Sequence, residues 1–397
     1  MKAVVLVAGK GTRMEPLTSN CPKVMLQVAN KPILEHILNS AIEAGIDGFV
    51  FITGYLEEQI REYFGDGSRW GVNIEYVQQK EQLGTANAIG CAKGHVDGAF
   101  LVLNGDMLIG QEDLKILLSR TEEAVICVKE VENPSDFGVL ETENNRVVRI
   151  IEKPKNPPTN LANAGIYLFR ESIFDFIDKT EASVRNEFEV TDSIQMLIDS
   201  GAAVGYNSLD GRWIDIGYPW DLLRANEYLL KSLKRNCEGT VEPNATIKGE
   251  VLIGKGTLIR NGSYIEGPVI IGENCDIGPN CFIRPSTAIG NHVRIGNAVE
   301  IKNAIIMENT HVGHLSYAGD SIIGRGCNFG AGTKVANLRH DGKNIKVMMK
   351  GRILDSGRRK LGVIMGDDVH TGINTSINIG VIMEKGRFTY PGEIVKH

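Results

Sequence analysis

Long apolar runs are missing from this sequence of 397 residues. A membrane-spanning helix needs about 20 consecutive apolar residues, and no segment approaches that length. The apolar run at residues 3–7 is too short for a signal peptide, and Lys10 and Arg13 follow it closely. The seven cysteines are scattered, odd in number and without a Cys-x-x-Cys pair, which is typical of reduced thiols. We therefore expect a cytoplasmic protein that does not associate with a membrane.

Positive charge is not in excess either. Lysine and arginine number 43 against 49 aspartates and glutamates, which gives a formal net charge of −6. This balance argues against a general nucleic-acid-binding surface. Hydrophobic residues make up 42% of the chain, so cores of ordinary size can form, and the length suggests two or three domains.

What the sequence does contain is two halves with different periods. In residues 1–235, apolar segments at 3–7, 48–53 and 99–103 read as strands, and amphipathic segments at 33–44 and 85–91 read as helices. This alternation predicts an α/β, Rossmann-like domain with a mixed, mainly parallel sheet and helices on both faces. Ligands of such sheets lie beyond the carboxyl ends of the strands. The turns after Val7 and Leu103 are therefore the expected place for a site.

From residue 236 the period changes to six, which predicts a second domain over 236–397. Branched aliphatic residues recur at every sixth position in one unbroken series: Val241, Ile247, Ile253, Ile259, Ile265, Ile271, Ile277, Ile283, Ile289, Ile295 and Ile301. Small or compact residues stand four positions after them, from Thr257 to Val299. This is the hexapeptide pattern of a left-handed parallel β-helix, in which the aliphatic side chains stack inward at roughly 4.8 Å.

The hexapeptide phase is lost twice. It is absent between Met307 and Ser321, and again from Asn337 to Leu361, where the segment is strongly basic. A segment that leaves a solenoid is often its binding element. A solvated surface loop has the same composition, so the sequence leaves both interpretations open.

A glycine-rich turn follows the first predicted strand, at residues 8–13. Glycines let the backbone approach phosphate oxygens, which accept its N–H groups. The turn is neither a Walker A sequence nor a dinucleotide fingerprint, so alone it is weak evidence. The segments that accompany it are more specific: residues 8–18, 22–26, 31–34, 82–86, 104–106, 137–139, 152–154, 163–167 and 213–217.

Together and in this order, these segments resemble sugar-1-phosphate nucleotidylyltransferases over nearly all of residues 1–235. Segments 16–18 and 213–217 are closer to the glucose-1-phosphate thymidylyltransferase branch of that family. The resemblance implies that Arg13 and Lys23 are catalytic, neutralising the triphosphate and the leaving pyrophosphate. It also implies that Asp106 and Asp215 hold Mg²⁺. Without the surrounding motifs, these four residues would be read as surface charges and turn residues.

The same resemblance implies the remaining contacts of the first half. The nucleotide would be bound by Gly9, Gly11, Thr12, Gln79, Gly84 and Thr85. The sugar phosphate would be bound by Gly138, Glu152, Lys153 and Asn163. Gln79 is the least certain of these residues, because Gln78 beside it could read the base as well.

Three segments of the second half, residues 297–304, 313–320 and 327–333, carry a second resemblance. They are similar to the acetyltransferase domain of the bacterial bifunctional N-acetylglucosamine-1-phosphate uridylyltransferase/glucosamine-1-phosphate acetyltransferases. His314 stands where the phase breaks, so we expect it to project from the coil and to take a proton from a sugar ammonium. A turn histidine without chemistry is the alternative. The implied contacts to substrate and acetyl-CoA are Arg284, Lys302, Tyr317, Asn328, Ala331, Asn337, Lys343 and Lys346.

These resemblances predict a bifunctional enzyme. It would acetylate glucosamine 1-phosphate with acetyl-CoA, then transfer UMP, and also dTMP, from UTP or dTTP to N-acetylglucosamine 1-phosphate or glucose 1-phosphate. Family members form trimers about the coil, which implies a homotrimer here. Two alternatives remain open: a mannose-1-phosphate guanylyltransferase, and a regulatory subunit that binds nucleotide sugars without catalysis. The basic segment is longer than its bacterial counterpart, which puts Lys343 and Lys346 in doubt.

Overall fold

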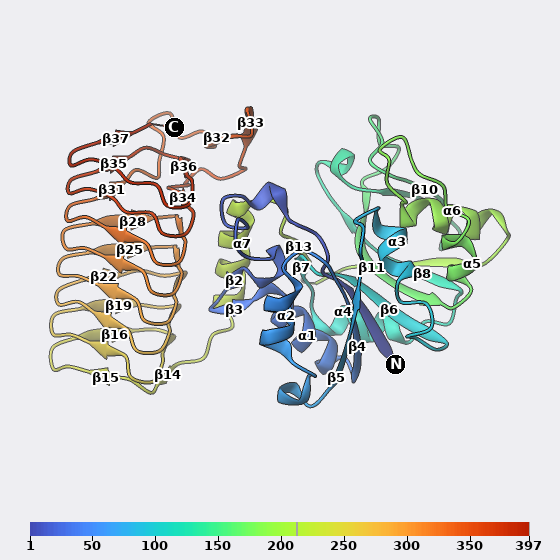
Figure 1. Ribbon diagram of the computed structural model, residues 1–397, viewed down its shortest axis with the longest axis horizontal. Helices are drawn as coiled ribbons and strands as arrows, with labels where there is room; N and C mark the ends of the chain where they lie inside the picture. The colour runs from blue at the N-terminus through green and yellow to red at the C-terminus, as the bar shows by residue number, and fades with distance from the viewer. Residues whose placement is uncertain (212, 397) are drawn as a thin grey trace. The chain divides into compact units, whose positions relative to one another are not determined.

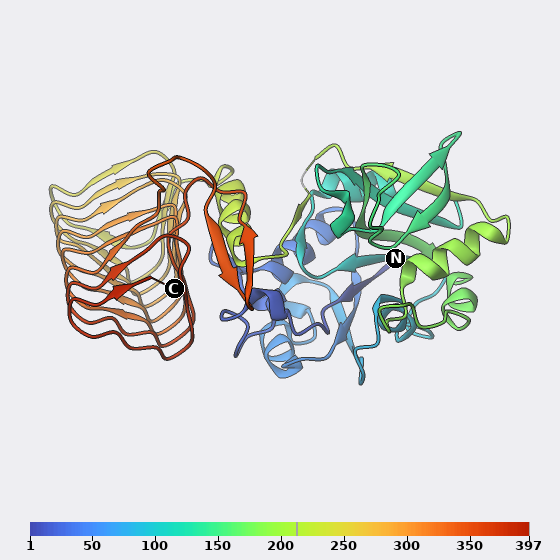
Figure 2. The same cartoon turned by 90° about the horizontal axis from the view of Figure 1, so that it is seen from above.

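The computed structural model describes residues 1–211 and 213–396 (Figures 1 and 2). Its chain separates into two compact units. The first contains Met1–Lys10, Pro22–Met25 and Ile33–Asp215, and the second contains Gly11–Cys21, Leu26–Pro32 and Ile216–His397. Two short segments near the N-terminus therefore group with the C-terminal half. The domain boundary at residues 235 and 236 stays a prediction, and His397, where the second domain was predicted to end, lies outside the described residues.

The first unit is built on a sheet of nine described strands in the order β5-β4-β1-β6-β11-β8-β12-β10-β9. Their bounds are β1 Lys2–Leu6, β4 Gly48–Thr53, β5 Asn73–Gln78, β6 Ala99–Asn104, β8 Ala124–Glu130, β9 Val139–Glu143, β10 Arg146–Ile151, β11 Leu161–Arg170 and β12 Val204–Ser208. Strands β5, β4, β1 and β6 are parallel, as are β8 and β12. The long strand β11 pairs antiparallel with both β6 and β8.

Antiparallel pairing takes a larger share of this sheet than the sequence analysis predicted. One cause is the hairpin of β9 and β10, whose turn residues Asn144 and Asn145 both have positive φ, at 49° and 62°. Two consecutive left-handed residues form the turn that matches the twist of paired strands, and asparagine tolerates that conformation. The alternation of strand and helix upstream gave no signal for this change of direction.

Helices cover both faces of the sheet. The helices of this unit are α1 Ile33–Glu43, α2 Glu57–Phe64, α3 Thr85–Gly90, α4 Gln111–Leu118, α5 Ile173–Ile177 and α6 Val190–Asp199. In β1, the neighbours Ala3, Val4 and Val5 point to alternate faces, and all are at most 1% exposed. Burial on both sides is what a sheet between two helical layers requires. The predicted elements at 3–7, 33–44, 48–53, 85–91 and 99–103 are all present, with ends shifted by at most one residue.

The second unit contains a coil of short strands that visit three parallel sheets in turn (Figure 1). The first coil sheet contains β14 Asn236–Cys237, β17 Val251–Ile253, β20 Val269–Ile271, β23 Thr287–Ile289, β26 Ile305–Ile306, β29 Ile322–Ile323, β34 Ile364–Met365 and β36 Ile382–Met383. The second contains β15 Thr240–Val241, β18 Leu258–Ile259, β21 Asp276–Ile277, β24 Arg294–Ile295, β27 His311–Val312 and β30 Asn328–Phe329. The third contains β16 Thr246–Lys248, β19 Tyr264–Glu266, β22 Phe282–Ile283, β25 Glu300–Lys302, β28 Tyr317–Gly319, β31 Lys334–Val335, β35 Ser376–Ile377 and β37 Ile394–Val395.

The hexapeptide residues form the core of this coil. Ile265, Ile283 and Ile301 stack in successive turns of the third sheet, and each is 0% exposed. The compact residues of the repeat are buried as well, with Cys275 and Cys281 at 2%. Three parallel sheets with one aliphatic stack each are consistent with a parallel β-helix.

The coil continues through the region where the sequence phase was read as lost. From Thr240 to Ile283 each paired residue of the coil stands opposite one eighteen positions further on, as Ile283 does opposite Ile301. From Ala288 to Tyr317 the pairing distance is seventeen, as for Glu300 and Tyr317. The chain is one residue shorter at a corner, so the hexapeptide phase shifts by one without any break in the ladder. The interpretation of residues 307–321 as an interruption is therefore corrected.

The second break is a true insertion. The coil passes from Ile322–Ile323 directly to Ile364–Met365 in the first coil sheet. The inserted segment forms an antiparallel hairpin of β32 (Lys346–Met349) and β33 (Arg352–Asp355), closed at its base by a bridge between Leu338 and Lys360. The second unit also contains helix α7 (Pro219–Leu230) and the short pair β2 (Gln27–Val28) and β3 (Lys31–Pro32).

Candidate functional site

The two aspartates predicted to bind metal lie side by side in the first unit. Asp106 follows β6, and the next residues form the short strand β7 (Met107–Leu108). Strand β13 (Ile214–Asp215) pairs antiparallel with β7, and Asp215 stands opposite Met107. Residues far apart in sequence are thereby brought within one position of each other in a two-stranded ladder.

Lys23 joins this pair. Its Nζ lies 2.6 Å from Oδ2 of Asp106, and the lysine side chain is only 8% exposed against 33% for the aspartate. A lysine that is so buried must be paired, because an isolated buried ammonium is costly. The ammonium is therefore fixed beside the carboxylate and not free to sample solvent.

The turn that presents Asp106 depends on Gly105. A Cβ at this position would lie 2.7 Å from the Leu6 carbonyl oxygen and 2.7 Å from Cγ1 of Val7. The amide of Gly105 donates to that same Leu6 oxygen at 3.0 Å. Only glycine fits so close to the end of β1, which is why the turn lies directly at the carboxyl end of the parallel strands.

The glycine-rich turn is ordered by its own neighbours. Gly9 faces open space, since a Cβ there would meet nothing within 4 Å. Gly11 has φ 67°, in the left-handed region, and its carbonyl accepts a hydrogen bond from the Thr18 hydroxyl at 3.0 Å. Thr12, the third predicted residue, begins a short 3-10 turn and is exposed. The sequence analysis missed Gln82, whose Nε2 donates to the Ala8 carbonyl at 2.6 Å.

Arg13 lies in the second unit. Its guanidinium carbon is 5.5 Å from the ring centroid of Tyr218, which stacks on Trp220 at the start of α7. A cation over an aromatic face in this range is attracted by the ring quadrupole. Tyr218 thus orients the guanidinium, a partner that the sequence did not indicate.

Three predicted nucleotide contacts lie around the start of α3. Gly84 has φ 122°, and a Cβ there would lie 2.5 Å from the Phe188 carbonyl oxygen. The hydroxyl of Thr85 accepts a hydrogen bond from the Val190 amide at 3.0 Å. Gln79 is 6% exposed, and its Nε2 donates to Asn87 Oδ1 at 2.8 Å and to the Gly84 carbonyl at 3.3 Å. The amide group of Gln79 therefore braces the turn.

The four predicted sugar-phosphate residues lie together. A Cβ on Gly138 would be 3.1 Å from Oε2 of Glu152 and 3.5 Å from Cβ of Asn163. The Asn163 amide donates to the Gly138 carbonyl at 2.8 Å. Lys153 has its Nζ 3.6 Å from Oε1 of Glu152. Polar groups of both signs thus surround a space that glycine keeps open.

A charged cluster beside this group was not predicted. Arg185 Nη1 lies 3.1 Å from Oε1 of Glu152 and 3.1 Å from Oε1 of Glu189. Burial raises the pKa of Glu189, and the neighbouring charge of Glu152 raises it further. Residues 181–187 carry no strand or helix pattern, so the sequence gave no reason to place Arg185 here.

In the second unit, four polar residues form one network at a corner of the coil. Asp320 is 2% exposed, and its Oδ2 lies 3.1 Å from Lys302 Nζ and accepts a hydrogen bond from Asn337 Nδ2 at 2.6 Å. The same amide donates to the Tyr317 hydroxyl at 3.0 Å. Burial raises the pKa of Tyr317, which keeps its hydroxyl protonated. Lys302, Tyr317 and Asn337 were predicted, whereas Asp320, which joins them, was not.

Two left-handed residues on successive turns of the coil belong to this network. Asn303 and Asp320 have left-handed φ values of 45° and 51°, and Asn303 Nδ2 donates to Asp320 Oδ1 at 2.8 Å. Arg284, also predicted, pairs through Nη1 with Oε1 of Glu300 at 2.8 Å, and Glu300 is the ladder partner of Tyr317.

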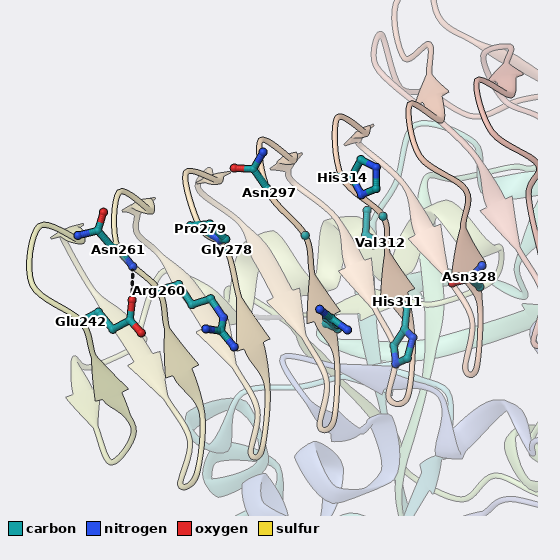
Figure 3. Close-up of a pocket in the computed structure, with 13 residues that line it drawn as sticks. Glu242, Arg260, Asn261, Gly278, Pro279, Asn297, His311, Val312, His314 and Asn328 are labelled. Atoms are coloured by element: carbon teal, nitrogen blue, oxygen red, sulfur yellow. Dashed lines mark hydrogen bonds between the residues drawn. The ribbon is translucent and has the colours of Figure 1, made fainter.

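His314 and Asn328 line a different cavity of about 960 Å³ on the coil (Figure 3). His314 is exposed at the corner after β27, so it projects from the coil as predicted. Arg260 and His311 line the same cavity. Ala331 lies on the next turn of the coil, where the neighbouring Gly332 amide donates to the His314 carbonyl at 2.9 Å.

The inserted segment lines a second cavity of about 670 Å³. Its lining residues are Asp320, Leu338, Gly357, Arg358, Arg359 and Lys360. Asp320 connects it to the network of Lys302 and Tyr317. Lys343 and Lys346 are exposed and do not line it, so the basic residues of this cavity are others than those that the resemblance implied. The inserted segment contains nine basic residues. Composition alone could not tell which of them line a cavity on the coil.

The chemistry of the first-unit carboxylates fits Mg²⁺. Over residues 1–211 and 213–396, no group of three or more histidine, cysteine, aspartate or glutamate side chains could form an all-protein metal site. Magnesium is commonly held by one or two carboxylates together with waters and substrate phosphates. Asp106 and Asp215 supply two carboxylates, which is within that number.

Comparison with known proteins identifies the class. A family model for nucleotidyl transferases matches residues 2–232, and a model for the GMPPB C-terminal domain matches residues 265–388. A structure of UDP-glucose pyrophosphorylase complexed with UDP-glucose is 26% identical, with a TM-score of 0.53, covering 58% of this chain and 98% of that one. The first unit thus has a nucleotidyltransferase fold.

Several relatives cover both halves of the chain. Bifunctional protein GlmU of Methanocaldococcus jannaschii is 46% identical over 383 residues, which is 96% of this chain and 91% of that protein. The bifunctional sugar-1-phosphate nucleotidylyltransferase/acetyltransferase of Sulfurisphaera tokodaii is 42% identical over 400 residues, covering 100% and 97%. The chain belongs to this family of bifunctional enzymes, as the resemblance implied, and neither alternative is favoured. Within the described residues, no helix is both long and apolar enough to cross a membrane.

Proposed function

We propose that the protein makes UDP-N-acetylglucosamine in two reactions. It first acetylates glucosamine 1-phosphate with acetyl-CoA and then couples N-acetylglucosamine 1-phosphate to UTP. The pairing of Asp215 with the strand that follows Asp106, with Lys23 at 2.6 Å, carries this proposal, because it assembles cation and carboxylates at the end of the parallel strands. We include dTTP and glucose 1-phosphate as substrates, on the likeness of segments 16–18 and 213–217 to thymidylyltransferases.

In nucleotidyl transfer, an oxygen of the sugar phosphate forms a bond to the α-phosphorus as the bond to the β-phosphate oxygen breaks. Pyrophosphate leaves with that electron pair. The nucleophile is already ionised, so the chain needs no base and instead positions two anions. Lys23 and Arg13 neutralise the phosphates, and Asp106 and Asp215 would hold Mg²⁺ against them. The metal supplies further charge neutralisation when it is bound.

The nucleotide would be bound by Gly9, Gly11, Thr12, Gln79, Gly84 and Thr85. The sugar phosphate would be held by Gly138, Glu152, Lys153 and Asn163. The Glu152 carboxylate would accept hydrogen bonds, the Asn163 amide would accept and donate them, and the Lys153 ammonium would face the phosphate. The compactness of the Gly138 group supports this role.

In acetyl transfer, the sugar nitrogen attacks the thioester carbon and the carbon–sulfur bond breaks. The sulfur of CoA leaves with that electron pair and becomes a thiol with the proton that the acetylated nitrogen gives up. His314 would take the proton from the sugar ammonium. Arg284, Lys302, Tyr317 and Asn328 would hold the amino sugar phosphate, and Ala331 and Asn337 would contact acetyl-CoA. We also assign Arg358, Arg359 and Lys360 to the phosphates of this half, in place of Lys343 and Lys346.

We further propose that the coil is a left-handed β-helix and that the protein is a homotrimer through it. Light scattering of the purified chain should give three times its 43.4 kDa mass. A monomer would contradict the trimer.

The deciding experiment mixes the protein with glucosamine 1-phosphate and acetyl-CoA and follows the release of thiol. A parallel panel of UTP, dTTP and GTP with several sugar 1-phosphates follows pyrophosphate. Thiol release together with pyrophosphate release from UTP is expected. Pyrophosphate from GTP and mannose 1-phosphate alone, without thiol release, would replace the proposal with the guanylyltransferase alternative.

A further inference from the structure

The loop Gly11–Cys21, which carries Arg13, is attached to the coil and its inserted hairpin, all within the second unit. Glu15 Oε2 lies 2.9 Å from Nζ of Lys350 at the hairpin tip. Pro16 packs over the coil at Gly366. A Cβ added to Gly366 would lie 3.1 Å from the Cβ of Pro16. The hairpin tip therefore contacts Glu15, which is two residues along the chain from the predicted catalytic residue Arg13.

A third contact fixes the end of the same loop. The guanidinium of Arg325 in the coil hydrogen-bonds the Cys21 thiol, and burial raises the pKa of that thiol. Arg325 is held in turn by Glu308, whose Oε1 is 2.5 Å from its Nε. The loop is thus anchored at its end by a buried group and at its middle by the exposed pair of Glu15 and Lys350.

The residue type at the hairpin tip does not suit the turn. Lys350 and Gly351 both have left-handed φ values, at 48° and 74°. Glycine, asparagine and aspartate are preferred in a two-residue turn of this kind, and lysine is strained there. Turn formation therefore does not explain the lysine, whereas its contact with Glu15 does.

We propose that Lys350 is a positioning residue for nucleotidyl transfer: through Glu15 it fixes the loop that carries Arg13. This inference rests on the proposed function of that loop. It also gives the inserted hairpin, which leaves the coil beside the proposed acetyl-transfer residues, a role in the other reaction of the enzyme.

Charge reversal in the full-length protein tests the proposal. K350E replaces attraction to Glu15 by repulsion, and K350N keeps a residue suited to the turn while it removes the ammonium. We expect both to raise KM for the nucleoside triphosphate, K350E by about five-fold, the scale of an exposed ion pair. The acetyl-transfer rate should stay unchanged, because Lys350 has no contact with that network among the described residues.

The matched control is R352E, which makes the same charge change two residues away, at the first position of β33. Arg352 is exposed, and the described residues give it no ion pair. We expect R352E to retain the wild-type KM, and the double variant E15K/K350E to recover most of the loss. A KM for K350E equal to that of R352E, or a double variant no better than K350E, overturns the proposal.

A second readout does not depend on activity. Amide hydrogen exchange of residues 11–21 should be faster in K350E and K350N than in the wild type and R352E. Unchanged exchange in K350E overturns the inference even if no nucleotide is turned over. A wild-type protein that releases no pyrophosphate would instead contradict the proposed function, so the two failures are distinguishable.

Discussion

Lys23 and Asp106 form a close, partly buried pair, with 2.6 Å between Nζ and Oδ2. Asp106 is 83 residues further along the chain, in the turn after β6, where Gly105 lies close against the end of β1. Asp215 joins them through the ladder of β7 and β13. This cluster makes the nucleotidyl-transfer proposal open to direct mutational tests.

Asp106→Ala should lower nucleotidyl transfer by about 100-fold or more, since it removes both a metal ligand and the partner of Lys23. Acetyl transfer should persist, because its residues lie in the second unit. Pyrophosphate and thiol release measured on one preparation will separate the two rates. The exposed Asp97→Ala serves as a control of equal chemistry. Loss of both activities in a folded Asp106→Ala protein would show that the reactions are not independent.

His314→Ala should have the opposite effect. Loss of a general base commonly costs about 100-fold or more, so thiol release should fall while pyrophosphate release continues. His340→Ala, an exposed histidine of the inserted segment, is the matched control. Wild-type acetyl transfer in the His314 variant would remove the histidine from the mechanism.

Gly84→Ala should destabilise the first unit by about 2–4 kcal/mol, because it combines backbone strain with overlap of two backbone groups. The alanine Cβ would lie 2.5 Å from the Phe188 carbonyl oxygen, which cannot swing away as a side chain could. Gly71→Ala is the control: its φ is 73° but it faces open space, so about 1 kcal/mol is expected. Urea denaturation of both variants measures the difference in the free energy of unfolding. Equal losses of stability in the two variants would mean that the backbone around Phe188 shifts to accommodate the added methyl group.

Glu189→Gln should change how stability depends on pH. The pKa of Glu189 is raised above its ordinary value of 4.5, chiefly by burial, so the folded state favours the protonated carboxyl. Its contribution is complete below pH 4.5 and is lost as the pH rises through the raised pKa. The variant and the wild type should therefore have similar melting temperatures near pH 4. Toward pH 7 the melting temperature of the variant should rise relative to that of the wild type. A gap that is constant with pH would contradict this assignment.

Several features could be predicted from the sequence alone. The six-residue period determined the coil, because an inward aliphatic side chain at every sixth residue can be buried only if successive turns stack, as Ile283 and Ile301 do. The ordered motifs of the first half indicated which residues gather: Gly138, Glu152, Lys153 and Asn163 lie together as expected. Local patterns and motif order are enough where the contacts follow from strand and turn geometry.

Only the tertiary structure decided the rest. Asp320 could not be selected from the sequence, because its partners Lys302 and Asn337 are 18 and 17 residues away and meet it only in the folded coil. Arg185, Gln82 and Lys350 each have a partner distant in sequence, namely Glu152, Ala8 and Glu15. Long-range ion pairs and close backbone approaches are set by how the chain packs. The sequence therefore shows which side chains are polar or charged, but not which residues they contact in the folded chain.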